Sequence, residues 1–221
     1  MAQAVKIKSI EHLTHDVLKI VAEKPTGLQF TPGQAVDVAV NKPGWEKEWR
    51  SFTFTSLPDE DEIEFNIKTY PSHNGVTNQL LALKADDELI IGSVYGDIAY
   101  KGEGIFIAGG AGITPFLAIL RNLKKQGEIG NNKLIFANKT KGDIIREDFF
   151  KELLGKNFTN VLSEEDAEGY LHGYVTPEVI KNLIDDHKYF YLCAPPPMMD
   201  AVEKHLASLG VTSEQIVKEG F

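Results

Sequence analysis

The chain has 221 residues, of which 43% are hydrophobic and 25% charged, so it can bury a core and is not expected to be disordered. This length allows one large domain or two small ones. The net charge of −9 argues against nucleic-acid binding, because phosphate contacts need clustered Lys and Arg side chains.

Several further classes of protein are excluded by simple absences. No segment approaches the roughly 20 apolar residues of a membrane span, and the first residues lack the apolar run of a signal peptide. We therefore expect a cytoplasmic location. Cys193 is the only cysteine, which excludes an internal disulfide and an iron–sulfur cluster held by four thiolates. We expect no carboxylate near His12 and His15, and hence no metal site there.

The first hundred residues have the pattern of β structure. Apolar and polar residues alternate over residues 35–40 and 62–68, which is typical of strands with one buried face. Turn residues separate such segments at 32–33, 42–44 and 58–61. One short helix is predicted near residues 78–83. Many short strands with this punctuation predict an antiparallel barrel.

After Gly104 the pattern changes to alternating strands and helices. Apolar runs at residues 105–108, 134–136 and 189–193 predict strands that are buried on both faces. Between and after them, helices are predicted from about Thr114 to a cap at Gly127, over 147–154, from 176 onward, and over 197–209. This alternation predicts a doubly wound α/β domain with a parallel sheet.

A glycine-rich segment joins the first of these strands to the first helix. Gly110 and Gly112 would let backbone N–H groups approach a pyrophosphate at the helix N-terminus, with Thr114 as the N-cap and Pro115 in the first turn. The loop lacks the G-x-G-x-x-G spacing. A glycine turn used only for close packing is therefore an equal alternative.

A second motif, Arg50-Ser51-Phe52-Thr53, lies in the β half. It offers a cation for phosphate, an aromatic ring for a flat cofactor and a hydroxyl for a ring nitrogen. The alternative is a strand with one exposed Arg and one core Phe. Strict alternation also places Thr53 on the opposite face from Arg50 and Phe52.

Two further features lie near the end of the chain. Cys193 is followed by a proline-rich turn that includes Pro195 and Met198, at the end of a strand where α/β proteins bind ligands. The alternative is a buried small side chain before a helix. Phe221, the last residue, either packs on the surface or covers a flat ring.

Taken together and in this order, these motifs resemble the ferredoxin–NADP reductase superfamily, which includes flavodoxin reductases and NADH–cytochrome b5 reductase. The resemblance runs from residues 31–34 to Phe221. It implies a six-stranded antiparallel β-barrel that binds FAD over residues 1–101. A doubly wound α/β domain that binds NAD(P) would follow over residues 102–221.

The resemblance also implies a role for each matching residue. Arg50 would pair with the FAD pyrophosphate, and Thr53, Cys193 and Phe221 would lie around the reacting rings as catalytic residues. The remaining FAD positions would be Ser51, Phe52, Ile67, Lys68, Tyr70, Gly75, Val76, Thr77 and Asn78. The remaining nucleotide positions would be Gly110, Gly112, Thr114, Pro115, Pro195 and Met198. Asn78 and Ala194 stand where the family has a hydroxyl residue and a glycine.

The implied activity is transfer of hydride from NADH or NADPH to FAD, followed by electron transfer to a separate acceptor such as a ferredoxin or flavodoxin. The acceptor is expected to be separate because the chain carries no cluster or haem motif. The alternative is a flavin-binding electron-transfer subunit or redox-responsive module without efficient NAD(P)H turnover. Lys139, Lys141 and Arg146 are candidate partners for the 2′-phosphate of NADPH. The oligomeric state stays open.

Overall fold

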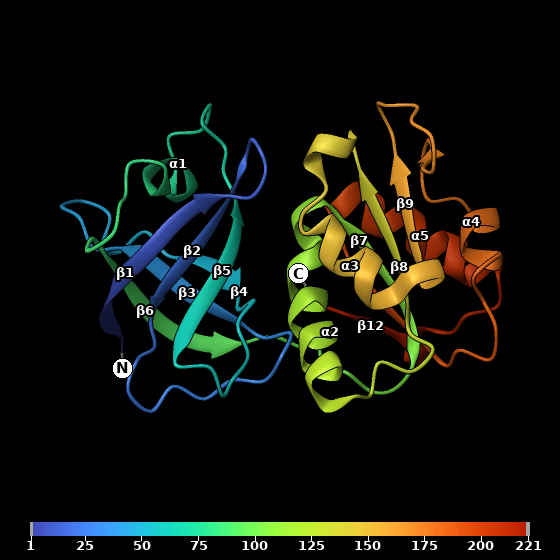
Figure 1. Cartoon of the computed structure of the whole chain (residues 1–221), viewed down its shortest axis with the longest axis horizontal. Coiled ribbons are helices and arrows are strands. Elements are labelled where there is room, and N and C mark those ends of the chain that lie inside the picture. Colours follow the sequence, from blue (N-terminus) through green and yellow to red (C-terminus); the bar gives the residue numbers. More distant parts are fainter. Residues whose placement is uncertain (1, 220–221) are drawn as a thin grey trace.

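The computed structural model describes residues 2–219 and shows two domains side by side (Figure 1). The first domain is an antiparallel sheet of six strands in the order β4-β3-β6-β1-β2-β5. Its elements are β1 (Gln3–His12), β2 (Val17–Glu23), β3 (Ala35–Val40), β4 (Arg50–Thr53), β5 (Glu62–Lys68), α1 (Val76–Leu80) and β6 (Glu88–Tyr95). The predicted antiparallel six-stranded barrel is confirmed.

The sheet closes into a barrel just beyond the end of β4. Phe54 forms an isolated antiparallel bridge with Phe65 of β5, and the Thr55 N–H group donates to the Glu64 carbonyl at 2.8 Å. Inside the barrel, apolar residues at alternate positions along the strands pack together. The ring of Phe54 stacks between those of Phe30 and Phe65. Alternate residues of β5 therefore face outward, away from this core.

The second domain is a parallel sheet of six strands in the order β10-β9-β8-β7-β11-β12. The strands are β7 (Gly104–Gly109), β8 (Lys133–Asn138), β9 (Phe158–Leu162), β10 (Leu171–His172), β11 (Tyr189–Cys193) and β12 (Ile216–Lys218). The helices are α2 (Thr114–Gln126), α3 (Glu147–Leu154), α4 (Pro177–Lys181) and α5 (Pro196–Ser208), with 3-10 turns at Gly110–Ile113, Lys141–Asp143, Gly155–Asn157 and Ser213–Gln215.

Helices cover both faces of this sheet, as a doubly wound fold requires. α2 and α3 pack on one face and α4 and α5 on the other, each pair over its own apolar cluster. The strand order reverses at β7, because β8 and β9 extend to one side and β11 and β12 to the other. The carboxyl ends of β7 and β11 therefore form the crevice where such folds bind ligands.

One predicted detail of α2 is wrong. Thr114 is the first residue of the helix and not its N-cap; Ile113 occupies the cap position without a side-chain hydrogen bond. The Thr114 hydroxyl instead donates back to the Ala111 carbonyl at 3.1 Å, because a 3-10 turn precedes the helix directly. Pro115 lies in the first turn and Gly127 ends the helix in a left-handed conformation, both as predicted.

The two domains share part of their packing. Val17 and Ile98 of the barrel domain belong to the same apolar cluster as α2 and the central strands of the second sheet. Polar contacts flank this cluster: Arg121 of α2 donates to the Thr55 carbonyl and pairs with Glu60 at 2.7 Å. None of the helices within residues 2–219 is long and apolar enough to cross a membrane.

Candidate functional site

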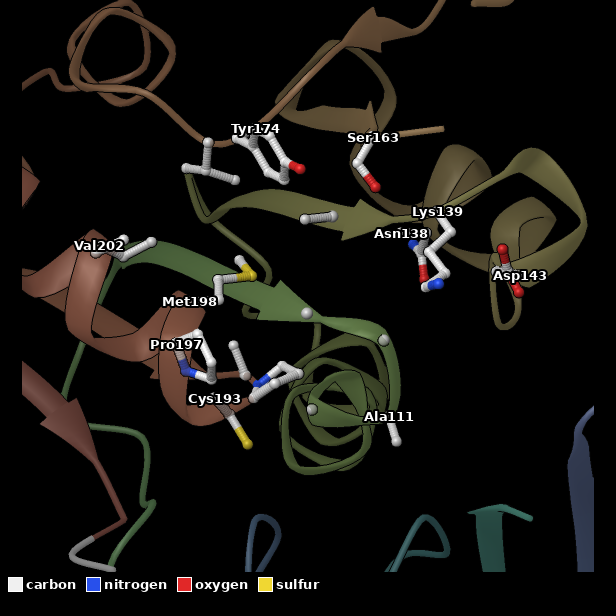
Figure 2. A pocket seen from close by; sticks show the side chains of 18 of the residues that line it. Ala111, Asn138, Lys139, Asp143, Ser163, Tyr174, Cys193, Pro197, Met198 and Val202 are labelled. Atoms are coloured by element: carbon white, nitrogen blue, oxygen red, sulfur yellow. The ribbon is translucent and has the colours of Figure 1, made fainter. Parts of the chain in front are cut away.

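A cavity of about 730 Å³ opens at the carboxyl ends of β7, β8 and β11, at the point where the strand order reverses. Its walls come mainly from the second domain, and Lys68 and Tyr70 of the barrel domain complete them. Figure 2 shows Cys193, Pro197 and Met198 along one side of the cavity and Asn138, Lys139 and Asp143 along the other. The size and position suit a dinucleotide or another ligand of that size.

The glycine loop forms one boundary of the cavity, and its glycines serve two different purposes. Gly110 has a φ of +52° and no atom within 4 Å of a built Cβ, so its backbone stays open to a ligand. A Cβ on Gly112 would instead lie 2.6 Å from the Cys193 carbonyl carbon. Gly112 is therefore required for close packing between the loop and the end of β11, as the packing interpretation expects, while the backbone at Gly110 leaves the nucleotide interpretation open.

Cys193 ends β11 and lines the cavity with a neutral thiol. Burial raises the pKa of this thiol to about 12, and the nearby Glu219 carboxylate adds to the shift. Burial also raises the pKa of Glu219, which lies beside the chain segment leaving the barrel at Gly96 and Asp97. The site therefore presents an uncharged sulfur and not a nucleophilic thiolate.

Ala194 also lines the cavity, and its methyl group packs close to the end of β7. A Cβ built on Gly109 would lie 2.9 Å from the Ala194 Cβ and 3.0 Å from Pro195 Cδ. The absence of a side chain at Gly109 thus makes room for the methyl group of Ala194.

The opposite wall contains a buried polar side chain that sequence reasoning missed. Asn138, the last residue of β8, is only 8% exposed, and neither of its amide atoms has a hydrogen-bond partner among residues 2–219. It lines the cavity together with Ser163, the residue that directly follows β9. Buried amides are normally satisfied, so a ligand with donor and acceptor groups is the natural partner of Asn138. Its place at the end of a parallel strand was the only sequence signal.

The remaining boundary of the cavity is apolar, and Met198 is the one residue of it that the sequence predicted. Tyr174 is 78% exposed and, with Val175, Met198 and Val202, borders the cavity on the side away from Asp143 (Figure 2). An exposed aromatic side chain on a cavity wall offers a flat surface for a ring. Tyr174 itself was not predicted, because it lies in an irregular segment between β10 and α4 where no local pattern marks it.

Two predicted barrel residues reach the cavity. Lys68 is held by Asp16 at 2.6 Å. Burial raises the pKa of Asp16, but the Lys68 ammonium, the Thr14 hydroxyl and His15 together lower that pKa below its usual value. Tyr70 is 44% exposed and stacks on the ring of His73 at 5.6 Å. Lys68 at the end of β5 and Tyr70 just beyond it thus bring a cation and an aromatic ring to the nucleotide domain.

The Arg50 motif lies outside this cavity, on β4. Arg50 is exposed and donates to the Trp49 carbonyl at 2.6 Å, so its guanidinium remains accessible to an anion. Ser51 is exposed, and Phe52 and Thr53 are half-buried, with the Phe52 ring 6.5 Å from that of Phe65. The phenyl ring is thus partly engaged by the barrel core, as the alternative interpretation required.

The phosphate turn of the barrel has an open backbone. Gly75 precedes α1, no side chain caps that helix, and a Cβ on Gly75 would meet nothing within 4 Å. Val76 is buried in the barrel core, Thr77 and Asn78 are half-buried, and the Asn78 N–H group already donates to the Gly75 carbonyl at 3.0 Å, which leaves the N–H groups of Val76 and Thr77 at the start of the helix. With the exposed Arg50, this donor set fits a phosphate-bearing cofactor such as FAD.

The other predicted residues are placed as follows. Ile67 fills the barrel core, and Thr114 and Pro115 are buried at the start of α2, so only backbone atoms or the Thr114 hydroxyl could address a ligand. Gly110, Gly112, Cys193, Pro195 and Met198 all line the cavity. Phe221 lies outside the described residues.

The three candidate cations for a 2′-phosphate have different surroundings. Lys139 lines the cavity but pairs with Glu164 at 2.9 Å, a hydrogen bond that raises the pKa of Lys139. The Lys141 ammonium lies 5.5 Å from the centre of the Tyr170 ring. Arg146 faces the barrel, where its guanidinium meets Glu64 at 3.4 Å, and it is not among the residues that line the cavity.

The expectation of no carboxylate near His15 is wrong. His15 Nε2 lies 3.7 Å from carboxylate oxygens of both Asp16 and Asp143, and these ligand atoms lie within 4.8 Å of one another. The second domain brings Asp143 to the β1–β2 turn, which the sequence does not reveal. Asp16 is already paired with Lys68, and Asp143 accepts from the Thr140 N–H and hydroxyl groups at 2.8 and 2.7 Å. These contacts account for both carboxylates without a metal ion.

Comparisons with known proteins agree with this geometry. A family model for an FAD-binding domain matches residues 2–93, and one for an oxidoreductase NAD-binding domain matches residues 106–204. The reductase component of propane 2-monooxygenase from Mycolicibacterium goodii is 32% identical over 98% of this chain and 66% of that protein. The chain therefore spans just under two thirds of that relative.

Another relative, NADH-cytochrome b5 reductase 1 from Aspergillus clavatus, is 32% identical over 98% of this chain and 77% of that protein. A ferredoxin NADP+ reductase from Neisseria gonorrhoeae, solved with bound FAD and NADP, superposes with a TM-score of 0.86 at 21% identity. That match covers 99% of this chain and 98% of the solved chain, and it supports the same two-domain fold.

Proposed function

Because the chain belongs to the ferredoxin–NADP reductase superfamily of FAD- and NAD-binding oxidoreductases, we propose that it oxidises NADH and passes the electrons to a separate acceptor protein. The observation that carries this proposal is the cavity at the strand-order reversal, bordered by the glycine loop, by neutral Cys193 and by Lys68 from the barrel. FAD, when bound, supplies a ring that accepts a hydride and can release its electrons singly.

The protein's own residues position and screen the nucleotide. The open backbone at Gly110 accommodates a pyrophosphate, and the Lys68 ammonium adds positive charge on the barrel side. Tyr174 and Met198 offer an apolar surface for the adenine ring, while Asn138 and Ser163 offer hydrogen bonds to ribose hydroxyls. Cys193 lines the cavity with a neutral thiol, so it would contribute no charge beside a nicotinamide ring bound there.

NADH is the better substrate in this proposal. Of the three cations considered for a 2′-phosphate, only Lys139 borders the cavity, and Glu164 already neutralises it. Asp143, also on this wall, would repel an added phosphate. A polar but uncharged pair, Asn138 and Ser163, suits the two hydroxyl groups of NADH.

The test is anaerobic reduction of the purified holoprotein, followed as loss of flavin absorbance. We expect saturable bleaching with NADH and a ratio of rate to half-saturating concentration at least about tenfold lower with NADPH, which corresponds to ~1.4 kcal/mol. Glu164→Gln should free Lys139 and narrow that difference. Absence of bleaching with both nucleotides would contradict the proposal and favour the electron-transfer module without NAD(P)H turnover.

The acceptor is the least constrained part of the proposal. Relatives are named as reductase components of oxygenases and as cytochrome b5 reductases, so protein acceptors of one electron are the class to test. NADH-reduced protein should be mixed anaerobically with ferredoxin, flavodoxin, cytochrome b5 and a dye. A protein acceptor is indicated if one of the three proteins reoxidises the flavin at micromolar concentration; reoxidation by the dye alone would contradict it.

A further inference from the structure

The outer face of β5 carries a partly buried carboxylate that meets two arginines of the other domain. Side chains alternate along a strand, so Glu64, Asn66 and Lys68 share the face that looks away from the barrel core. Figure 1 shows β5 on the side of the barrel that faces the second domain. Lys68 on this face lines the nucleotide cavity, while Glu64, four residues earlier, lies in the domain interface.

Glu64 is held from both sides. Its carboxylate, whose side chain is 15% exposed, accepts from the Thr55 hydroxyl at 2.8 Å and from the Asn66 amide at 3.1 Å within the barrel domain. From the second domain, Arg146 Nη2 lies 3.4 Å from both carboxylate oxygens, and Arg121 Nη1 lies 4.0 Å from one of them. We call these three charged residues the Glu64 clamp.

Arg146 has an unusual backbone for this task. It is one of the two non-glycine residues with positive φ among residues 2–219, at φ +57° immediately before α3. A non-glycine residue in the left-handed region is unfavourable, so the surrounding structure must hold Arg146 there. This conformation occurs at the residue whose guanidinium reaches across to the barrel.

The clamp is poorly suited to be a device for stability alone. The two Arg146 hydrogen bonds are long, and both Arg146 Nε and Asn66 Oδ1 are buried without a hydrogen-bond partner within residues 2–219. The three charged side chains are only partly buried, at 15–32% exposure, and ion pairs that lose hydration often add little to stability, whereas they can select one geometry over others. Orientation of one domain against the other is therefore the function that its geometry supports.

We propose that the Glu64 clamp positions the barrel face of the nucleotide cavity, so that Lys68 and Tyr70 stand at the correct distance from the glycine loop. Glu64 and Arg146 are thus positioning residues for nucleotide binding and do not touch the substrate. The inference rests on the proposed function, because it concerns the cavity in which that function takes place.

Two variants test the clamp. Glu64→Gln keeps the shape of the side chain and removes its charge. Arg146→Asn removes the guanidinium, and because Asn tolerates the left-handed region, it leaves the backbone unstrained. Lys125→Gln is the matched control, since Lys125 pairs with Asp59 across the same interface but both side chains are more than half exposed.

The measurements are NAD+ binding to the holoprotein by calorimetry, the NADH concentration dependence of flavin reduction, and the melting temperature. We expect both clamp variants to weaken NAD+ and to raise the half-saturating NADH concentration by between about threefold and tenfold. The double variant should be no worse than either single variant, because each removes the same interaction. Lys125→Gln should stay within about 1.5-fold of wild type, as an exposed pair contributes little.

The outcomes separate this inference from the proposed function. If wild-type protein is not reduced by NADH, the proposed function fails. If wild type is reduced and both clamp variants match it in NAD+ affinity and NADH dependence, the clamp has no positioning role, whatever happens to the melting temperature. Additive losses in the double variant would likewise contradict a shared interaction.

Discussion

The protonation state of Cys193 follows from its burial and not from its being a cysteine. A cysteine at a reactive site is commonly taken as a nucleophile, which requires a thiolate at neutral pH. Here the pKa of the thiol is raised to about 12 by burial and by Glu219, so the thiolate is scarce. The sequence places the residue at the cavity but does not contain this information, because Glu219 approaches from another element.

Iodoacetamide should alkylate the Cys193 thiol slowly, and the alkylation rate should not level off with rising pH up to pH 10. In the folded protein, the iodoacetamide reaction at pH 8 should be at least about 100-fold slower than in urea, where an ordinary thiol has a pKa of about 8.5. Its rate should keep rising between pH 8 and 10. Mass spectrometry can follow the reaction unambiguously, since the chain has a single cysteine. A rate that levels off near pH 9 would show that the thiol ionises normally.

Asn138 and Tyr174 are two residues of the cavity that were not among the site residues predicted from the sequence. Both belong to the cavity only because strands distant in the chain end at the same edge of the sheet. The glycine loop and Cys193 were identified because local sequence patterns signal them: glycines between a strand and a helix, and a proline-rich turn after an apolar run. Convergence of distant segments leaves no comparable local pattern.

At the level of whole elements, the sequence was most informative where local rules act alone. The helix expected over residues 147–154 is α3, and the strand expected over 189–193 is β11, with the same bounds. Prediction of the Thr114 N-cap failed because the preceding 3-10 turn takes over the start of α2. That turn depends on the fit of the glycine loop against β11, which no local rule describes.

The contact between the glycine loop and β11 can be tested by adding one methyl group. Gly112→Ala places a Cβ against the Cys193 carbonyl group, which is backbone and cannot turn away. The free energy of unfolding should fall by about 1–3 kcal/mol, as for other overpacked sites. Gly142→Ala is the control, because its Cβ would meet only Thr140 Oγ1 at 3.8 Å. Urea unfolding of both variants measures this effect. Equal free energies of unfolding for Gly112→Ala and Gly142→Ala would contradict the contact.

At the scale of the whole molecule, the two domains behave as one packed body. Their interface has a shared apolar cluster at its centre and charged pairs around it, including Arg121 with Glu60 and Arg146 with Glu64. The last described residue, Glu219, lies beside Gly96, where the chain leaves the barrel. The end of the second domain therefore contacts the end of the first.

Glu219 gives this junction a predictable pH dependence. Burial raises its folded pKa, so its contribution to stability is full below about 4.5 and is lost as pH rises through the folded pKa. Glu219→Gln removes the titration. The variant's free energy of unfolding, measured in urea relative to wild type, should therefore increase between pH 5 and pH 8. Glu214→Gln is the matched control, because Glu214 is exposed in the turn before β12. A flat difference for Glu219→Gln would contradict the raised pKa.

The shared cluster also constrains how such proteins can change over generations. Gly33 has no room for a side chain, because Ile98 of its own domain and Ile119 of α2 occupy the space. A larger residue at 119 would therefore press on the barrel at Gly33. A chimera that joins the barrel of one relative to the α/β domain of another would pack poorly at the domain interface wherever the residues at these contacts differ, even with both binding sites intact. The halves of this fold must be inherited, and redesigned, as a pair.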